Sequence, residues 1–176
     1  AFRRIDFRVA ATADQFTTIA KLRALRRTWA RVGEVLEVPE ADRGAWVHAV
    51  TSWRMQTRTD PWVNILRDTI ACFAAAAGGA DAITVLPYDH ALGLPTAFSR
   101  RVARNTQSLL SSESNVARVA DPAGGSAYVE SLTDELARAA WTWFGQLDAA
   151  GGAAAALAAG TVAERLAATS AERDVA

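Results

Sequence analysis

The sequence predicts an α/β chain made of repeated strand–helix units. Two observations predict it: short β-prone apolar segments alternate with long amphipathic segments, and glycine or proline punctuates the boundaries between them. A third is the steady spacing, because the expected strands begin near residues 4, 46, 82 and 117. Such alternation is typical of parallel strands joined by right-handed crossover helices.

The first unit combines an expected strand over residues 3–11 with a long helix. The strand segment RRIDFRVAA alternates and is β-prone. In the following helix, apolar residues recur at steps of three and four, which places one apolar stripe along it. The stripe consists of Phe16, Ile19, Leu22, Leu25, Trp29, Val32 and Leu36, and Pro39 closes the helix.

The second unit combines an expected strand over residues 45–53 with a helix that begins at Asp60. Asp60 is the expected N-cap, and Pro61 suits the first helical position because no N–H donor is required there. Gly78 and Gly79 are expected to end the helix. The predicted buried face consists of Ile65, Leu66, Thr69, Ile70, Phe73 and Ala76.

The third and fourth units follow the same order. Residues 82–86 form a short, continuously apolar segment, which is typical of a strand covered on both faces. A helix with Phe98, Val102, Thr106, Leu109 and Leu110 inside is expected next, followed by a fourth strand over residues 116–120. The turn DPAGGS leads into a helix whose expected inner residues are Val129, Leu132, Leu136, Ala140, Trp143, Phe144 and Leu147. The alanine-rich remainder, broken at Gly160, predicts one or two further helices.

Four such units form either a small open sheet or half of an eight-stranded, TIM-type (β/α) barrel. In both cases the loops after the strands form the ligand-bearing edge. We therefore expect residues 1–147 to hold the four units and residues 148–176 to form a C-terminal helical segment.

Composition excludes several classes of protein. The 176 residues are 51% hydrophobic and 22% charged with a net charge of +0, which gives no electrostatic argument for binding nucleic acid or membranes. One cysteine, Cys72, excludes an internal disulfide and a thiolate zinc cluster. No segment reads as a membrane span or signal peptide, so we expect a cytoplasmic location. Because the chain starts at Ala1 and soon enters a strand, we expect a fragment, a processed chain or a trimmed sequence.

The loop segment LPYDHALGLP raises the question of a metal ligand. His90 lies in an H-x-x-G pattern one register away from D-x-H-x-x-G, which supplies the lower cobalt ligand in many cobalamin-binding domains. In that motif the aspartate two places before the histidine orients its ring. Here Tyr88 holds that place and Asp89 is adjacent to the histidine. The pattern therefore argues against a cobalt ligand, and we predict no metal-binding residue.

For the other candidate residues, the sequence favours structural roles over catalytic or binding ones. DPAGGS can cradle a phosphate at a helix N-terminus, but no P-loop lysine follows, and a tight turn capped by Ser126 is favoured. His48, inside an expected strand, is expected to be a hydrogen-bonded structural histidine. Cys72 is expected to be a buried thiol. The cluster of Arg100, Arg101 and Arg104 is expected to be a solvated or interface face.

Residues 101–126, RVARNTQSLLSSESNVARVADPAGGS, resemble the signature segment of the methylmalonyl-CoA mutase family. That segment has an R-I-A-R-N-T-Q helix, then E-E, a short strand and D-P-x-G-G-S. The likeness extends over nearly the whole chain. FTTIAKLRALRRTWARV is similar to the family pattern F-x-x-I-A-K-L-R-A-x-R-x-x-W, DPWVNILRDTI to D-P-Y-N-N-I-x-R-T-x-I, and DHALGLP to D-E-A-L-G-L-P.

The resemblance implies the second half of an eight-stranded (β/α) barrel that threads coenzyme A through its axis. Family members hold adenosylcobalamin over the carboxyl face and interconvert methylmalonyl-CoA and succinyl-CoA. By the same resemblance, His90, Ala91 and Leu94 lie in the cobalamin-facing loop, and Gln56 matches a substrate-side glutamine. His90 replaces a family glutamate that is not a cobalt ligand.

Departures from the family pattern point to a chain without a working site. The loop Q-T-S-G-W is cut to MQTRTDP, the histidine segment Y-H-M-Q-E-A-G is not among the 176 residues, and TVLPYD replaces L-H-T-N-S-x-D. These changes resemble the non-catalytic small subunit that many bacterial members pair with a homologous catalytic chain. We therefore expect no catalytic residue here, a heterodimer, and cofactor and acyl-CoA binding only through the complex.

Two alternatives stay open at this point: a catalytic barrel fragment with an unusual loop, or an unrelated α/β binding module. A half barrel also leaves two unpaired strand edges. We therefore expect the segment to need the amino-terminal half of the barrel, or another chain, to be stable.

Overall fold

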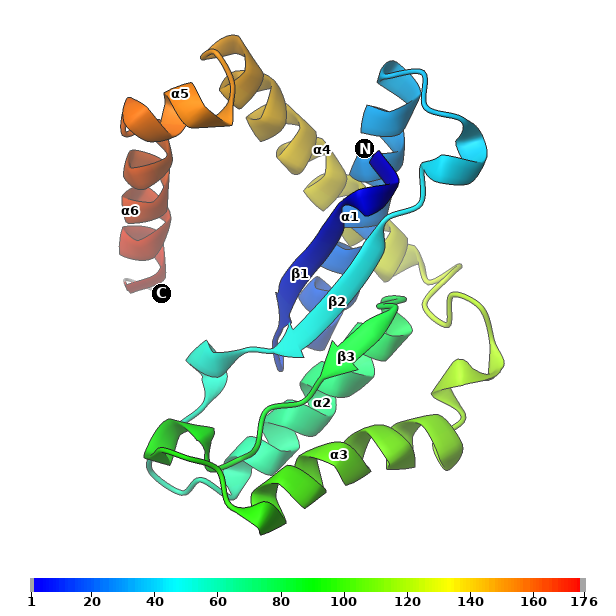
Figure 1. Ribbon diagram of the computed structural model, residues 1–176, viewed down its shortest axis with the longest axis vertical. Helices are drawn as coiled ribbons and strands as arrows, with labels where there is room; N and C mark the ends of the chain where they lie inside the picture. Colours follow the sequence, from blue (N-terminus) through cyan, green and yellow to red (C-terminus); the bar gives the residue numbers. More distant parts are fainter. Residues whose placement is uncertain (1, 175–176) are drawn as a thin grey trace. The chain divides into compact units, whose positions relative to one another are not determined.

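The computed structural model describes residues 2–174 as three strands and six helices (Figure 1). The chain divides into two compact units, residues 1–137 and 138–176, and helix α4 runs from one into the other. The elements are β1 (Asp6–Ala11), α1 (Gln15–Val35), β2 (Trp46–Thr51), α2 (Val63–Ala77), β3 (Ala82–Thr84), α3 (Ala97–Ser112), α4 (Ala127–Ala149), α5 (Ala153–Ala158) and α6 (Thr161–Asp174).

The three strands form one parallel sheet in the order β1-β2-β3. Asp6 pairs with Trp46 at the start of β1, and Ala11 pairs with Thr51 at its end. His48 pairs with Ala82 on the other side of β2. The predicted α/β class and the parallel crossovers between the first three units are therefore confirmed.

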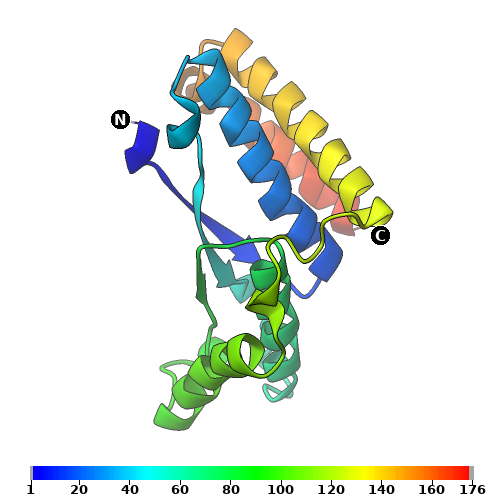
Figure 2. The same cartoon turned by 90° about the vertical axis from the view of Figure 1, so that its right-hand side faces the viewer.

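Helices α1 and α2 pack on the same face of the sheet, as Figure 2 shows from the side. The burial of β2 alternates strictly, with Val47 and Ala49 fully buried toward the helices and Trp46 exposed on the opposite face. This is the two-residue period of a strand with one covered face. The core between sheet and helices consists of Ala11, Leu22, Ala45, Val47, Ala49, Ala71 and Ala75.

The predicted buried face of α2 is wrong. Leu66 is 61% exposed and Phe73 is 37% exposed. The helix instead turns its small and polar residues inward, namely Asn64, Asp68, Ala71, Cys72, Ala74, Ala75 and Ala77. Alanines allow close approach to the sheet and to α1, and the two buried polar residues hold loops at the sheet edge. Hydrophobicity alone therefore selected the wrong side of this helix.

The predicted fourth strand over residues 116–120 is also wrong. The segment forms a 3₁₀ turn at Val116–Arg118, followed by Val119 in an extended conformation with its side chain 64% exposed. Asn115 and Asp121 bend the backbone on either side, with φ of 56° and 51°. Strand preference reflects packing and pairing with neighbours, and the three-strand sheet of the described residues includes no pairing for this segment.

Helix boundaries differ from prediction at the start of α2. Asp60 does not cap the helix, because its φ is 48° and the helix begins at Val63. The Val63 N–H donates to the Asp60 carbonyl, so residues 60–63 form a turn that leads into the helix. At the other end, Gly79 has a φ of 81°, in keeping with the predicted stop.

Residues 138–176 contain the second half of α4 and helices α5 and α6. Gly151 and Gly152, with φ of 94° and 90°, end α4, and Gly160, with φ of 82°, separates α5 from α6. The Arg165 guanidinium lies 5.8 Å from the centre of the Trp143 ring. The two further helices are as predicted, while the expected domain boundary between residues 147 and 148 stays a prediction.

Between residues 2 and 174, no helix combines the length and the apolar character that crossing a membrane requires.

Candidate functional site at the carboxyl edge of the sheet

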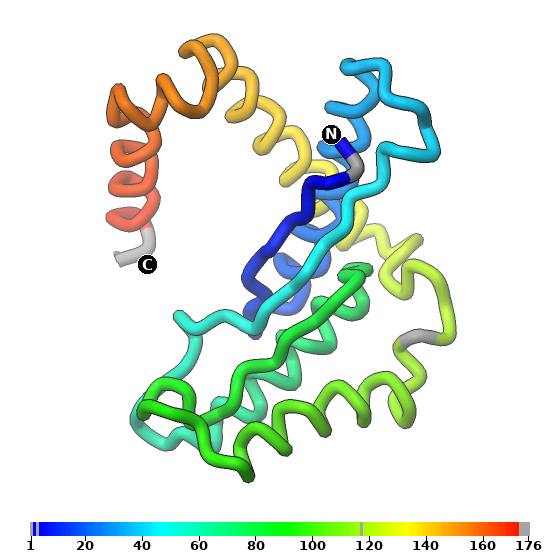
Figure 3. The backbone as a smooth tube through the Cα atoms, viewed as in Figure 1, coloured from blue at the N-terminus to red at the C-terminus, as the bar shows by residue number. Residues whose placement is uncertain are grey.

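Two loops meet where β2 and β3 end, and Asn64 joins them. The loops span residues 52–62 and 85–96, and they run side by side in the tube view (Figure 3). Asn64 is fully buried; its Nδ2 donates to the carbonyls of Thr57 and Tyr88, each at 2.9 Å. Its Oδ1 accepts from the Thr57 N–H at 3.0 Å and from Arg67 at 2.8 Å. One amide therefore fixes both loops to α2.

Gln56 is held by a buried acid that sequence reasoning missed. Its Nε2 donates to both carboxylate oxygens of Asp68, at 2.8 and 2.9 Å, and Asp68 is only 2% exposed. Burial raises the pKa of Asp68, against the opposing effects of hydrogen bonds from Gln56 and Thr51 and of the charges on His90 and Arg67. The available signal was the residue type itself, since Asp68 stands where the quoted family pattern has threonine.

His90 begins a short 3₁₀ helix, His90–Leu92, and is half-buried. It is close enough to Asp68 to stabilise that carboxylate electrostatically. The adjacent Asp89 accepts through Oδ2 from the Thr96 N–H and hydroxyl, both at 3.1 Å, and its Oδ1 is buried without a hydrogen-bond partner, so Asp89 makes no hydrogen bond to the imidazole. Burial opposes ionisation of Asp89, but hydrogen bonds from Ser99 and Thr96 outweigh it and lower its pKa.

The four residues that the resemblance singled out are only partly brought together. Gln56 and His90 both face Asp68, although they come from different loops. Ala91 is half-buried beside His90, whereas the Leu94 side chain is 99% exposed. Among the described residues, no group of three or more His, Cys, Asp and Glu side chains has the arrangement of a metal site.

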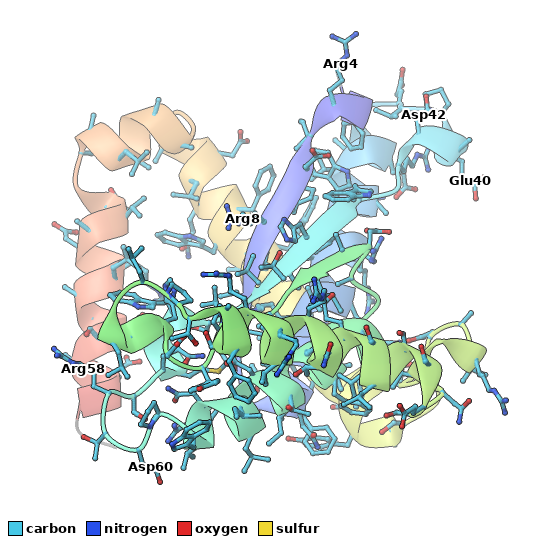
Figure 4. The ribbon with its side chains drawn as sticks, turned by 60° about the horizontal axis from the view of Figure 1, so that its bottom comes forward. Arg4, Arg8, Glu40, Asp42, Arg58 and Asp60 are labelled. Carbon is cyan, nitrogen blue, oxygen red and sulfur yellow. The ribbon has the colours of Figure 1, made fainter. Side chains whose placement is uncertain are left out.

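An aromatic stack closes the outer side of these loops. The Trp62 ring, 58% exposed, stacks on Tyr88 with ring centres 4.7 Å apart and planes at 25°. Tyr88 meets Phe98 edge-on at 6.5 Å, and Arg101 lies over Phe98 at 5.2 Å. In Figure 4, the exposed Arg58 of the loop at residues 52–62 points outward into solvent.

The predicted structural roles of His48 and Cys72 are confirmed. His48 Nε2 lies 2.8 Å from the Thr84 hydroxyl, which joins β2 to β3 across the open face of the sheet. Cys72 is 2% exposed, and the pKa of its thiol is raised to about 11. Burial is the larger cause, and the negative charge of Asp68 is the smaller one. Because the thiolate is the reactive form, the burial and the raised pKa of Cys72 both disfavour its reaction near neutral pH.

The DPAGGS segment is a structural turn, which is the role that the sequence favoured over a phosphate site. Ser126 Oγ accepts the Val129 N–H at 3.5 Å, which caps α4. The Gly125 N–H, which a phosphate would need, donates to Glu130 at 3.2 Å. Arg23 of α1 pairs with Asp121 and, at 2.5 Å, with Glu130. The turn is therefore occupied by the chain's own acids.

Comparison with known proteins identifies the family. The family model described as methylmalonyl-CoA mutase matches residues 1–176, so the chain belongs to the methylmalonyl-CoA mutase family.

Within that family the chain is more similar to proteins named as small subunits than to a relative named simply as a mutase. It is 64% identical over 173 residues to the methylmalonyl-CoA mutase small subunit of Streptomyces virginiae, covering 98% of this chain and 28% of the relative. It is 56% identical over 174 residues to the small subunit of Propionibacterium freudenreichii subsp. shermanii, covering 98% and 27%. The probable mitochondrial mutase of Caenorhabditis elegans is 41% identical over 159 residues, covering 89% and 21%. The chain thus spans about a quarter of the length of these relatives.

Proposed function

We propose that this chain is part of the non-catalytic small subunit of an adenosylcobalamin-dependent methylmalonyl-CoA mutase. In this proposal the subunit forms a heterodimer with a homologous catalytic chain that interconverts methylmalonyl-CoA and succinyl-CoA. The observation that carries it is the identity of 64% and 56% to small subunits, against 41% to a relative without that designation. The catalytic chain binds the acyl-CoA, and the heterodimer works in the cytoplasm without nucleic acid or membrane partners.

The loops at the sheet edge support a chain without a working site. Gln56, the remaining match to a substrate-side group, has its amide nitrogen engaged by Asp68. His90 stands in the place of a family glutamate, and Asp89, bonded to Thr96, does not orient it as a ligand. His90, Ala91, Leu94 and Gln56 are therefore proposed as vestiges of the family's cofactor and substrate contacts.

We propose that this chain binds no adenosylcobalamin of its own. In support, His90 has no aspartate two places before it, where Tyr88 stands instead, and the Oδ2 atom of the adjacent Asp89 is bonded to Thr96. In the proposed heterodimer the cofactor supplies the radical chemistry at the partner's site. This chain contributes a folded surface and no reacting group.

We further propose that residues 1–147 belong to the second half of a (β/α)₈ barrel, of which the described residues form three strands, with residues 148–176 as a helical extension. Parallel strands joined by helices on one face support this arrangement. Each of the two outer strands, β1 and β3, leaves one edge without a strand partner among the described residues. Unpaired strand edges invite pairing with other chain segments, so the half barrel requires further residues to close it.

Association with a catalytic homologue is the test of this proposal. When the full-length chain is co-expressed with the catalytic homologue from the same genome, we expect a stable heterodimer by size-exclusion chromatography with light scattering. As a control for self-association, the catalytic homologue is co-expressed with a second copy of itself that carries a different affinity tag. A full-length chain that remains monomeric beside the homologue would contradict the proposal.

A further inference from the structure

The pair Gln56–Asp68 contains an unsatisfied polar atom. Gln56 Oε1 is buried and has no hydrogen-bond partner in the structure, while Nε2 of the same amide lies within 2.9 Å of both Asp68 oxygens. A buried acceptor without a donor is unfavourable, and native proteins seldom retain one. The carboxylate form of Asp68 offers no hydrogen to Oε1, because an ionised carboxylate only accepts.

Protonation of Asp68 resolves the mismatch without another group. A protonated carboxyl has one O–H donor and one remaining carbonyl acceptor, and a primary amide has the complementary N–H and C=O. If the amide turns so that Nε2 bonds one carboxyl oxygen instead of both, the two groups meet edge to edge in a closed ring of two hydrogen bonds, in which Oε1 gains its donor. The proton comes from solvent and returns to solvent when the carboxyl ionises.

We propose that Asp68 and Gln56 form a proton-dependent latch that fixes the loop of residues 52–62 to α2. With the proton in place, the carboxyl–amide ring holds Gln56. After the proton leaves, Oε1 is buried without a donor, and the loop opens more often. The latch goes beyond the proposed subunit role and does not depend on it, since it uses only contacts within this chain.

The groups around Asp68 set the direction of the pH dependence. On α2, Arg67 lies one residue before it and Cys72 one turn after it; His90 faces it from the 3₁₀ helix, and Thr51 donates to it from the end of β2. Thr51 Oγ1 accepts the Leu86 N–H at 2.9 Å, which leaves the hydroxyl hydrogen of Thr51 free to be donated to Asp68. Burial outweighs the two cations and raises the pKa of Asp68. The stabilisation of the loop by the latch is therefore complete below the ordinary aspartate pKa. It is lost as the pH rises through the raised pKa of Asp68.

Hydrogen exchange in the full-length chain, with or without a bound partner, tests the latch. Two loop amides report on it: the Gln56 N–H, which donates to Trp53, and the Thr57 N–H, which donates to Asn64. After correction for intrinsic rates, we expect protection of residues 53–62 to fall by roughly tenfold between about pH 4 and pH 8, the scale of one unsatisfied buried acceptor. Protection of β2 provides the internal control.

Two variants separate the latch from a merely structural pair. Asp68→Asn mimics the protonated acid, because its amide donates to Oε1 and accepts from Nε2, so its protection is expected to be high and independent of pH. Gln56→Met removes the amide and is expected to give low protection that is also independent of pH. Infrared spectra of the wild type and Asp68→Asn provide a second readout, in which a carboxylic acid band present only in the wild type disappears over the same pH range.

Either of two results would overturn the latch. One is a wild-type exchange profile that matches Asp68→Asn at every pH. The other is protection that increases as the pH rises.

Discussion

Replacing Asn64 by alanine is expected to lower the free energy of unfolding of the full-length chain by about 4 kcal/mol, because each unsatisfied buried group costs about 1–3 kcal/mol. The substitution leaves the Thr57 N–H, the Thr57 carbonyl and the Tyr88 carbonyl without their partner at a fully buried position. Chemical denaturation monitored by circular dichroism measures the change.

Asn105 provides the matched control for this substitution. It lies on α3 with an exposed side chain, so Asn105→Ala changes the same residue type in the same kind of element. Exposed substitutions of this kind change stability by about 0.5 kcal/mol or less. Equal effects of the two substitutions would show that Asn64 does not join the loops in the way described.

The second large effect concerns turnover. The full-length chain alone is expected to convert methylmalonyl-CoA at least about a hundredfold more slowly than the heterodimer, because misplacement of reacting groups by about 1 Å already costs that factor. In this chain the amide nitrogen of Gln56 is engaged by Asp68, and His90 stands in the place of a family glutamate. An assay with added adenosylcobalamin, in which the catalytic homologue is titrated in, measures the difference.

The same titration distinguishes failure of the proposed heterodimer from failure of the proposed non-catalytic role. If the catalytic homologue is fully active without this chain and does not bind it, the proposed heterodimer is wrong. If this chain alone turns over substrate at the rate of the heterodimer, the proposal that it is non-catalytic is wrong. Neither result would bear on the Asp68–Gln56 latch, which is measured by exchange in the loop.

Patterns of strand and helix in the sequence predicted most of the fold, because they reflect local chemistry. Alternating strand segments, the long apolar stripe that includes Ile19 and Leu22, and the glycines around Gly160 each specify an element from nearby residues. Residues 116–120 carried the same local signal and formed a 3₁₀ turn instead. Strand formation there depends on a neighbouring edge and on the bends at Asn115 and Asp121, which no local pattern specifies.

The site was less predictable because its main residues are polar and buried. Counting apolar residues on α2 selected Leu66 and Phe73 as the inner face, whereas Asn64 and Asp68 point inward. Their burial is explained by partners that lie far away in the sequence, such as Tyr88, 24 residues from Asn64. Gln56 was found only through the family resemblance, which could not indicate that Asp68 occupies its amide.

The most direct test of the non-catalytic role is the stoichiometry of adenosylcobalamin in the purified heterodimer. Equilibrium dialysis with optical detection of the corrin gives the number of cofactors per complex and per isolated full-length chain. We predict one cofactor per heterodimer and none on this chain alone. Two cofactors per heterodimer, or a corrin retained by the isolated chain, would contradict the account.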